Sequence, residues 1–96
     1  VVINSGAVIG KNCIINSSAV IEHDCYIEDY VHISPNAALA GGVKIMEGSH
    51  IGIGSSIIQL ITIGEWSTVG AGSVIIKNVP GNTTVVGNPG RVINTE

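Results

Sequence analysis

Residues that could carry acid–base chemistry gather between Val20 and Ile33, in the stretch VIEHDCYIEDYVHI. This stretch holds two of the three histidines of the chain and four of its seven acidic residues. A neutral imidazole can accept a proton near neutral pH, so His23 and His32 are the first candidates for a general base. What either histidine can do depends on the elements that position it.

A metal site would be another use for several histidines, but their spacing does not favour one. Successive histidines are nine and eighteen residues apart, so the sequence has no closely spaced pair such as two histidines separated by four residues. Cys13 and Cys25 also match no metal or redox spacing. We therefore predict no metal site, and we expect the two cysteines to be small buried thiols in a reducing cytoplasm.

An aliphatic residue recurs every six positions from Ile3 to Ile75 without a break. Four positions after each of them stands a mostly small residue, and the position before that is usually Gly, Asn or Asp. These three residue types tolerate a positive φ, which indicates one left-handed turn residue in every hexad. Other types interrupt the turn pattern at four positions: Ser18, Tyr30, Leu60 and Trp66.

A period of six with a turn in each unit does not fit a helix, but it fits a short strand followed by a tight turn. Three such strands make one triangular coil of eighteen residues, and successive coils stack as parallel sheets about 4.8 Å apart. The fold class is therefore all-β. The bulky residues Tyr30, Leu60 and Trp66 should lie on the outside of corners, where a neighbouring subunit could cover them.

Stacking places residues eighteen apart directly above one another. Gly41 should lie above His23, with Gln59 above that, and His50 should lie above His32. His23 and Asp24 occupy outward turn positions where core packing does not require them. Simpler interpretations remain: Asp24, Gly41 and Gly42 could be turn residues only, and His32 and His50 could be ordinary polar surface.

Composition excludes several classes of partner. The net charge of −3 leaves no basic surface for nucleic acid. No apolar run approaches the roughly 20 residues that a membrane-spanning helix needs, so we expect no membrane partner. The chain begins within the repeat, which suggests a fragment of a longer protein.

Four phrases give the sequence a more specific resemblance: NSSAVIEHDCYIEDYVHISPNAALAGGVKI, IGIGSSII, TVGAGSVIIKNVP and VVGNPGRVI. They resemble the hexapeptide-repeat acetyltransferases, in the branch of sialic acid O-acetyltransferases and nucleotide-sugar N-acetyltransferases. The resemblance implies a left-handed parallel β-helix, a triangular prism of about four to five coils over residues 1–80. Residues 81–96 would form a short C-terminal capping tail, and the usual assembly would be a homotrimer.

The resemblance also implies roles for individual residues. His23 would be the general base for acetyl transfer from acetyl-CoA, with Asp24 orienting it and the Gly41 N–H holding the thioester carbonyl beside Gly42. The active site would lie between trimer subunits. Further cofactor contacts would come from His32 near the acetyl group, the amide of Ala71 on the pantetheine, and Lys77 and Arg91 on the phosphates.

The acceptor would be an amino or hydroxyl group of a sugar, either a nucleotide-linked amino sugar or sialic acid. Relatives carry a nucleotide-sugar-binding domain before the β-helix, and we expect such a domain upstream of Val1. An alternative function is a non-catalytic β-helical trimerisation scaffold, which would not need His23.

Overall fold

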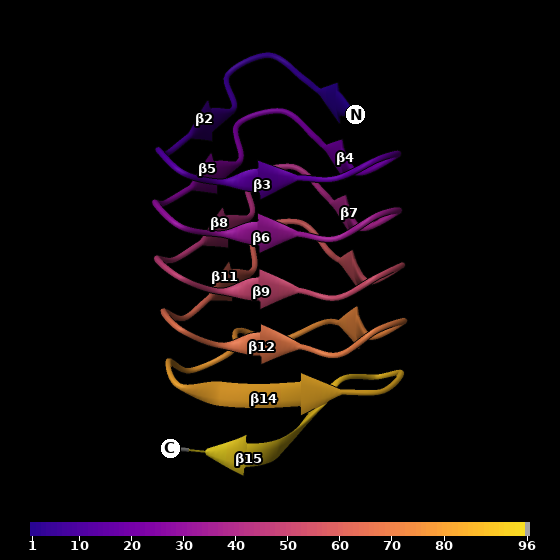
Figure 1. The fold of residues 1–96 in the computed structure, drawn as a ribbon. Coiled ribbons are helices and arrows are strands. Elements are labelled where there is room, and N and C mark those ends of the chain that lie inside the picture. Colours follow the sequence, from indigo (N-terminus) through magenta and orange to yellow (C-terminus); the bar gives the residue numbers. More distant parts are fainter. Residues whose placement is uncertain (96) are drawn as a thin grey trace.

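The computed structural model describes residues 1–95, and they form three sheets wound into a triangular solenoid of about five coils (Figure 1). The chain descends as a left-handed parallel β-helix, which confirms the predicted fold class (Figure 1). Thirteen two-residue strands follow the hexads before two longer ones: β1 Val2–Ile3, β2 Val8–Ile9, β3 Ile14–Ile15, β4 Val20–Ile21, β5 Tyr26–Ile27, β6 His32–Ile33, β7 Ala38–Leu39, β8 Lys44–Ile45, β9 His50–Ile51, β10 Ser56–Ile57, β11 Thr62–Ile63, β12 Thr68–Val69, β13 Val74–Ile75, β14 Thr83–Val86 and β15 Arg91–Thr95.

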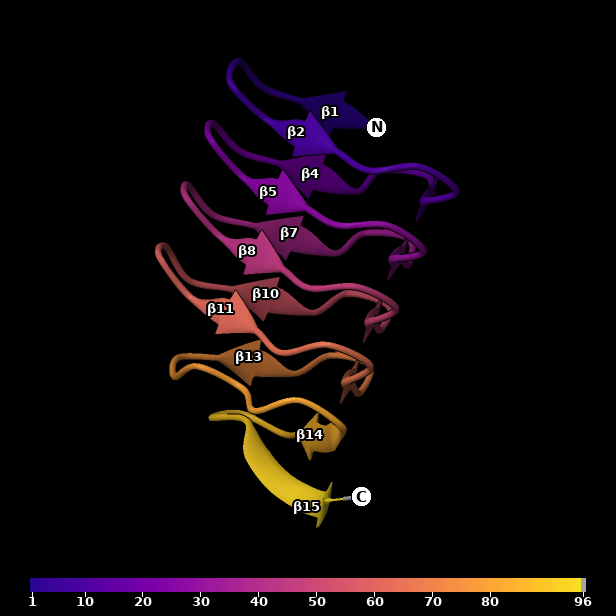
Figure 2. The same cartoon turned by 90° about the vertical axis from the view of Figure 1, so that its left-hand side faces the viewer.

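The three sheets form the three faces of the prism. Face A contains β1, β4, β7, β10 and β13, face B contains β2, β5, β8 and β11, and face C contains β3, β6, β9, β12, β14 and β15. Each hexad strand pairs in parallel with the strand one coil further on, as in Val2↔Val20 and His32↔His50. This register confirms the predicted coil of eighteen residues, and Figure 2 shows the strands of faces A and B stacked in order.

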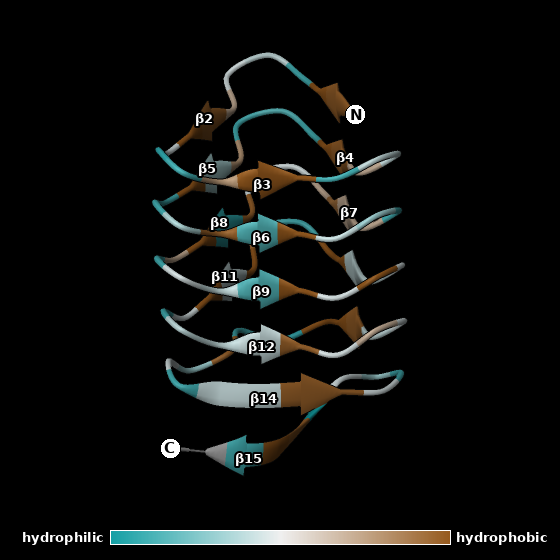
Figure 3. Ribbon diagram, viewed as in Figure 1, coloured by the Kyte–Doolittle hydropathy of each residue, from teal (hydrophilic) through white to brown (hydrophobic). Residues whose placement is uncertain are grey.

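The aliphatic residue of each hexad points into the prism and forms the core. In the middle coils these residues are fully covered, with Ile33, Leu39 and Ile45 at 0% exposure. Ile3 in the first coil is 47% exposed, because coils cover it from one side only. The brown arrowheads of the hexad strands in Figure 3 mark these aliphatic residues.

Where the small residue of a hexad is Ser or Cys, its side chain bonds neighbouring coils together. Ser49 Oγ donates to the Gly64 carbonyl at 2.7 Å, and Ser55 Oγ donates to the Gly70 carbonyl at 2.9 Å. Cys25 makes the equivalent thiol contact with the Ala40 carbonyl at 3.2 Å. A side chain in this slot therefore satisfies a carbonyl that the next coil would otherwise leave unpaired.

The predicted left-handed turn residue is present at every corner from Gly6 to Gly72. Even the residues that interrupt the turn pattern adopt a positive φ, with Leu60 at 62° and Trp66 at 54°. The fold therefore imposes this conformation regardless of residue type. As predicted, the bulky residues at these corners lie outside: Leu60 is 76% exposed and Trp66 is 57% exposed.

The regular period ends one corner earlier than the sequence suggests. Val69 pairs with Val85 and Ile63 with Val79, so this last coil is sixteen residues long and two residues shorter than the others. Asn78 is absent from the positive-φ residues of the described chain, and its Oδ1 instead accepts the Thr62 N–H at 2.9 Å. The hexad pattern predicted a turn residue there, and the shortened coil explains the difference.

The tail continues face C before it turns back. β14 pairs in parallel with β12, and β15 then pairs antiparallel with β14. In this position β15 covers the last parallel strand edge, as a cap would. The division of the chain at residue 80 stays a prediction. Within residues 1–95, no helix is long and apolar enough to cross a membrane.

Candidate active site

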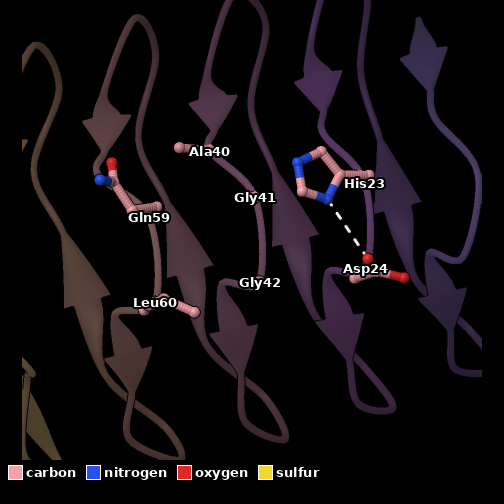
Figure 4. Close-up of a pocket in the computed structure, with 7 residues that line it drawn as sticks. All are labelled: His23, Asp24, Ala40, Gly41, Gly42, Gln59 and Leu60. Atoms are coloured by element: carbon pink, nitrogen blue, oxygen red, sulfur yellow. Dashed lines mark hydrogen bonds and ion pairs between the residues drawn. The ribbon is translucent and has the colours of Figure 1, made fainter.

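The corner between faces A and B carries the predicted catalytic pair. His23 and Asp24 follow β4, and Gly41 and Gly42 follow β7 at the same corner one coil further on. The Gly42 N–H donates to the His23 carbonyl at 3.0 Å, which holds the two corners in register. Figure 4 shows the His23 ring extending along the corner toward Gly41.

The carboxylate of Asp24 contacts the imidazole of His23 at the Nδ1 atom. His23 Nδ1 lies 3.3 Å from Asp24 Oδ2, and the two side chains are 66% and 73% exposed. A carboxylate accepts hydrogen bonds, so this contact favours the tautomer with the proton on Nδ1. The lone pair of His23 Nε2 is then free to accept a proton.

His23 Nε2 faces Gly41, and only glycine leaves space for it. A Cβ added at Gly41 would lie 2.8 Å from both Cε1 and Nε2 of His23. The neighbouring Gly42 has a positive φ of 70°, whereas the φ of Gly41 is not positive. The positive φ of the turn therefore favours glycine at position 42, whereas the close approach of the His23 ring requires glycine at position 41.

The Gly41 N–H is available for a ligand. At the corner between faces B and C, the equivalent N–H groups of Lys11 and Glu47 donate to the carboxylates of Asp29 and Glu28, at 2.9 and 3.0 Å. Within residues 1–95, no backbone carbonyl accepts from the Gly41 N–H. An unpaired donor beside a base is the arrangement that acyl transfer requires for the developing oxyanion.

These groups line an open pocket of about 550 Å³. Gln59 and Leu60, which the sequence did not mark as site residues, extend it by one coil. The signal for Gln59 was its position eighteen residues after Gly41. The pocket is lined by His23, Asp24, Ala40, Gly41, Gly42, Gln59 and Leu60 (Figure 4).

The structure does not bring the remaining predicted cofactor residues to this pocket. His32 and Ala71 line a second cavity of about 530 Å³ on face C, which lies opposite the corner between faces A and B. Lys77 is exposed at that corner beyond Gln59, and Arg91 is exposed at the start of β15. The candidate residues therefore fall on two sides of one prism.

Three acidic residues between Val20 and Ile33 have structural partners that the sequence did not reveal. Glu28 and Asp29, at the corner between faces B and C, each accept a backbone N–H from an adjacent coil, as described above. Glu22 accepts the Asn4 side-chain amide at 2.9 Å. These carboxylates therefore help to hold the coils together.

The thiols and potential metal ligands contribute no further site. Cys25 is buried as predicted, and burial raises the pKa of its thiol, which keeps it protonated and unreactive. Cys13 is only partly buried, because it lies in the first coil. In the part of the chain that the structure describes, no group of three or more His, Cys, Asp and Glu side chains could hold a metal ion.

Known proteins share both the sequence pattern and the fold of this chain. Residues 6–41 match the family described as bacterial transferase hexapeptide (six repeats). A serine acetyltransferase of Bacillus pumilus is 36% identical over 96 residues, which cover 92% of this chain and 39% of the relative. A serine acetyltransferase of Salmonella typhimurium is 37% identical, with 93% and 31% covered.

Solved structures give a fuller match. A mutant of GDP-perosamine N-acetyl transferase from Caulobacter crescentus, in complex with CoA and GDP-perosamine, superposes with a TM-score of 0.95 at 37% identity, covering 96% of this chain and 44% of that one. The acetyltransferase domain of PglB from Neisseria gonorrhoeae, in complex with acetyl coenzyme A, gives 0.86 at 38% identity, with 96% and 51% covered. The chain thus spans about half or less of each of these proteins. Its repeat, its β-helix and these likenesses together show that the chain belongs to the hexapeptide-repeat transferase family.

Proposed function

We propose that this chain is the β-helix of an acetyl-CoA-dependent acetyltransferase whose acceptor is an amino or hydroxyl group of a sugar. The observation that carries the proposal is the approach of His23 Nε2 to Gly41, beside an N–H with no backbone acceptor in residues 1–95. The complexes of the perosamine enzyme with CoA and a nucleotide sugar support the choice of substrates. Free cysteines suit a reducing cytoplasm as the compartment.

The proposed reaction uses each group at this corner once. His23 Nε2 removes the proton from the acceptor nitrogen or oxygen as that atom bonds to the thioester carbon. The Gly41 N–H stabilises the negative charge that develops on the carbonyl oxygen. When the carbon–sulfur bond breaks, the imidazolium returns the proton to the departing thiolate.

Asp24 has two roles in this scheme. Its φ of 60° makes it the turn residue of the hexad, and its carboxylate contacts Nδ1 of His23 at 3.3 Å. The carboxylate keeps the proton on Nδ1 and stabilises the imidazolium during transfer. The turn role and the catalytic role therefore coexist.

A homotrimer is part of the proposal, with the active site between adjacent prisms. His32 lies on face C, and Ala71 lines the same cavity from the adjoining corner, so both can contribute to the His23 site only if this side of one subunit meets the corner between faces A and B of another. Acetyl-CoA would then lie in the groove between the two prisms. Lys77, on the same corner as His23, would contact the phosphates.

A second acceptor is a hydroxyl group of serine rather than of a sugar. Several relatives at about the same identity are serine acetyltransferases, and one of them aligns with 92% of this chain. The two acceptors use the same base and the same acetyl donor, so this corner serves either. An acceptor panel of nucleotide-linked amino sugars, sialic acid and serine would separate them.

The test is acetyl transfer by the full-length protein with His23→Ala. Loss of a general base should lower kcat by about 10²- to 10⁴-fold. Ser5→Ala is the matched control, because Ser5 occupies the same corner position one coil earlier and should leave the rate unchanged. Wild-type rates in His23→Ala would rule out this mechanism, and a wild-type protein that is trimeric but inactive with every acceptor would favour the scaffold.

A further inference from the structure

Four side chains on face C form a continuous row of contacts, and His32 is the only one of them to which the proposed function assigns a role. Asn16 Nδ2 lies 2.8 Å from His32 Nε2, and Ser34 Oγ lies 3.0 Å from His50 Nε2. The rings of His32 and His50 stack with centroids 4.4 Å apart and planes inclined by 15°. One ordered unit therefore spans three consecutive coils.

The core fixes this stack in place. β6 and β9 pair in parallel with His32 opposite His50 and Ile33 opposite Ile51. Ile33 and Ile51 are fully buried, so a change of register would expose both of them. The two histidines must therefore project outward one above the other, and Figure 3 shows the first half of β6 and of β9 as hydrophilic.

The hydrogen bonds determine how the His32 ring is oriented. The Asn16 amide nitrogen is a donor, so His32 Nε2 must accept and the ring proton must sit on Nδ1. A protonated His32 would place two donors against each other. Asn16 therefore holds one edge of the His32 ring in a single neutral tautomer. The His50 ring packs against the face of the His32 ring.

His50 is suited to this supporting position because it stays uncharged. Burial and the neighbouring His32 lower the pKa of His50. The flanking residues in the same column are Ile14 below His32 and Thr68 above His50, and neither titrates. The nearly buried Ser34 fixes the far edge of the His50 ring.

We propose that His50 is a positioning residue for acetyl-CoA binding, which acts by fixing the plane and the tautomer of the His32 ring. Both rings line the face C cavity together with Ala71, the other residue of this cavity for which we propose a cofactor contact. The inference rests on the proposed function, because it assigns His32 to the acetyl-CoA groove. It adds a residue to that site that acts through His32.

The first test is steady-state kinetics on three variants of the full-length protein. His50→Ala removes the ring and should raise KM for acetyl-CoA roughly three- to tenfold, as expected for the loss of one aromatic pair, with kcat within about twofold. His50→Phe restores a flat neutral ring and should return KM close to wild type. Lys44→Ala is the matched control, since Lys44 holds the same hexad position on face B and should change neither constant.

The second test does not depend on activity. The nitrogen-15 NMR shifts of the His32 ring should show a single tautomer, with the proton on Nδ1, in the wild type and in His50→Phe. In His50→Ala the shifts should move toward an average of both tautomers, because the ring is no longer held against Asn16. Thermal unfolding of each variant shows whether it is folded.

The outcomes separate this inference from the proposed function. An unchanged KM in folded His50→Ala, or an unchanged His32 tautomer, would overturn the positioning role even if acetyl transfer is confirmed. A KM in His50→Phe as high as in His50→Ala would overturn it too, because stacking would then contribute nothing. If the wild type transfers no acetyl group, the proposed function fails, and the NMR result alone still decides whether His50 orders His32.

Discussion

At the scale of single residues, one glycine separates structural from functional requirements. Gly41 and Gly42 are neighbours at the same corner, but only Gly42 has the positive φ that makes glycine favourable for the turn. At Gly41 the reason is space, because the His23 ring lies where a side chain would begin. The two glycines should therefore respond differently to substitution.

Gly41→Ala should impair catalysis more than stability. Its Cβ would lie 2.8 Å from His23 Nε2, so the imidazole must swing away from the Gly41 N–H. We expect kcat to fall by about 10²-fold, the size of a misplaced catalytic group. Denaturant unfolding should show a loss below about 1 kcal/mol, since the Gly41 backbone needs no left-handed conformation. A variant that unfolds readily but keeps full kcat would contradict this assignment.

Leu60→Gly should stabilise the single prism, in which no neighbouring subunit covers the Leu60 side chain. Leu60 is held at a φ of 62° with its side chain 76% exposed, so it carries backbone strain and buries little. Relief of a left-handed conformation is worth about 1–2 kcal/mol, partly offset by the entropy of glycine in the unfolded chain, which leaves a gain of about 1 kcal/mol. Unfolding at a fixed protein concentration measures it.

Leu60→Ala is the control for this prediction, since alanine keeps the strain and should give no gain. Destabilisation by Leu60→Gly would mean that the leucine side chain is buried in the assembled protein. That result would support the proposed trimer, in which the corner between faces A and B is a subunit contact.

At the scale of elements, two-residue strands are stable here because each strand of the inner coils is bonded to the coil before and the coil after it. The parallel pairing supplies the backbone bonds, and where the small residue of a hexad is Ser or Cys it adds a side-chain bond, as Ser67 Oγ does to the Pro80 carbonyl at 2.6 Å. The same stacking forces identical hexad positions into columns. A column can then place a base and a glycine in successive coils, as with His23 and Gly41, or stack one imidazole on another, as with His32 and His50.

The stacked histidines should make stability depend on pH. The pKa of His50 is lowered from its ordinary value of 6.5 by burial and by His32. Between the lowered pKa and 6.5 the unfolded chain binds more protons than the folded one, so the free energy of unfolding falls as pH is lowered through this window. Above pH 6.5 this contribution is constant.

Denaturant unfolding between pH 7.5 and 5 would measure this effect. His50→Phe should flatten the dependence relative to wild type, because the titrating group is gone while the ring contact remains. Lys44→Ala should retain the wild-type slope. Equal slopes in wild type and His50→Phe would show that His50 does not titrate abnormally.

At the scale of the whole molecule, one prism cannot assemble the complete proposed site. The described residues form a body of 33 × 22 × 22 Å, with His23 on a corner and His32 on the opposite face. Corners with exposed apolar side chains, such as Leu60 and Trp66, are surfaces that a neighbouring prism could cover. A closed ring of three subunits would pair each corner with a different face C.

Mixed trimers test this arrangement. His23→Ala damages only the corner of a subunit and His32→Ala damages only its face C, so both variants alone should be strongly impaired. After equal amounts are unfolded together and reassembled, about a quarter of the interfaces should combine an intact corner with an intact face, and activity should recover accordingly.

A mixture of His23→Ala with Gly41→Ala is the control, because both defects lie on the corner and no interface can be intact. Recovery in the control, or none in the first mixture despite mixed trimers detected by mass, would contradict a shared site.

The sequence by itself determined the β-helix, its eighteen-residue coil and the residues that stack. This was possible because a period of six leaves only one way to put every aliphatic residue inside, and that choice fixes which residues share a column. His23 below Gly41 and His32 below His50 follow from that register alone. The left-handed winding came from the family resemblance, and Figure 1 agrees with it.

The tertiary structure decided what the period leaves open. Side-chain torsions are independent of the period, so only the tertiary structure shows the contact of Asp24 with Nδ1 of His23, the approach of His23 Nε2 to Gly41, and the contact of Asn16 with His32. The shortened last coil and the return of β15 depend on a loop that follows no repeat. The period stacks residues along the prism, but the contacts between columns depend on side-chain geometry.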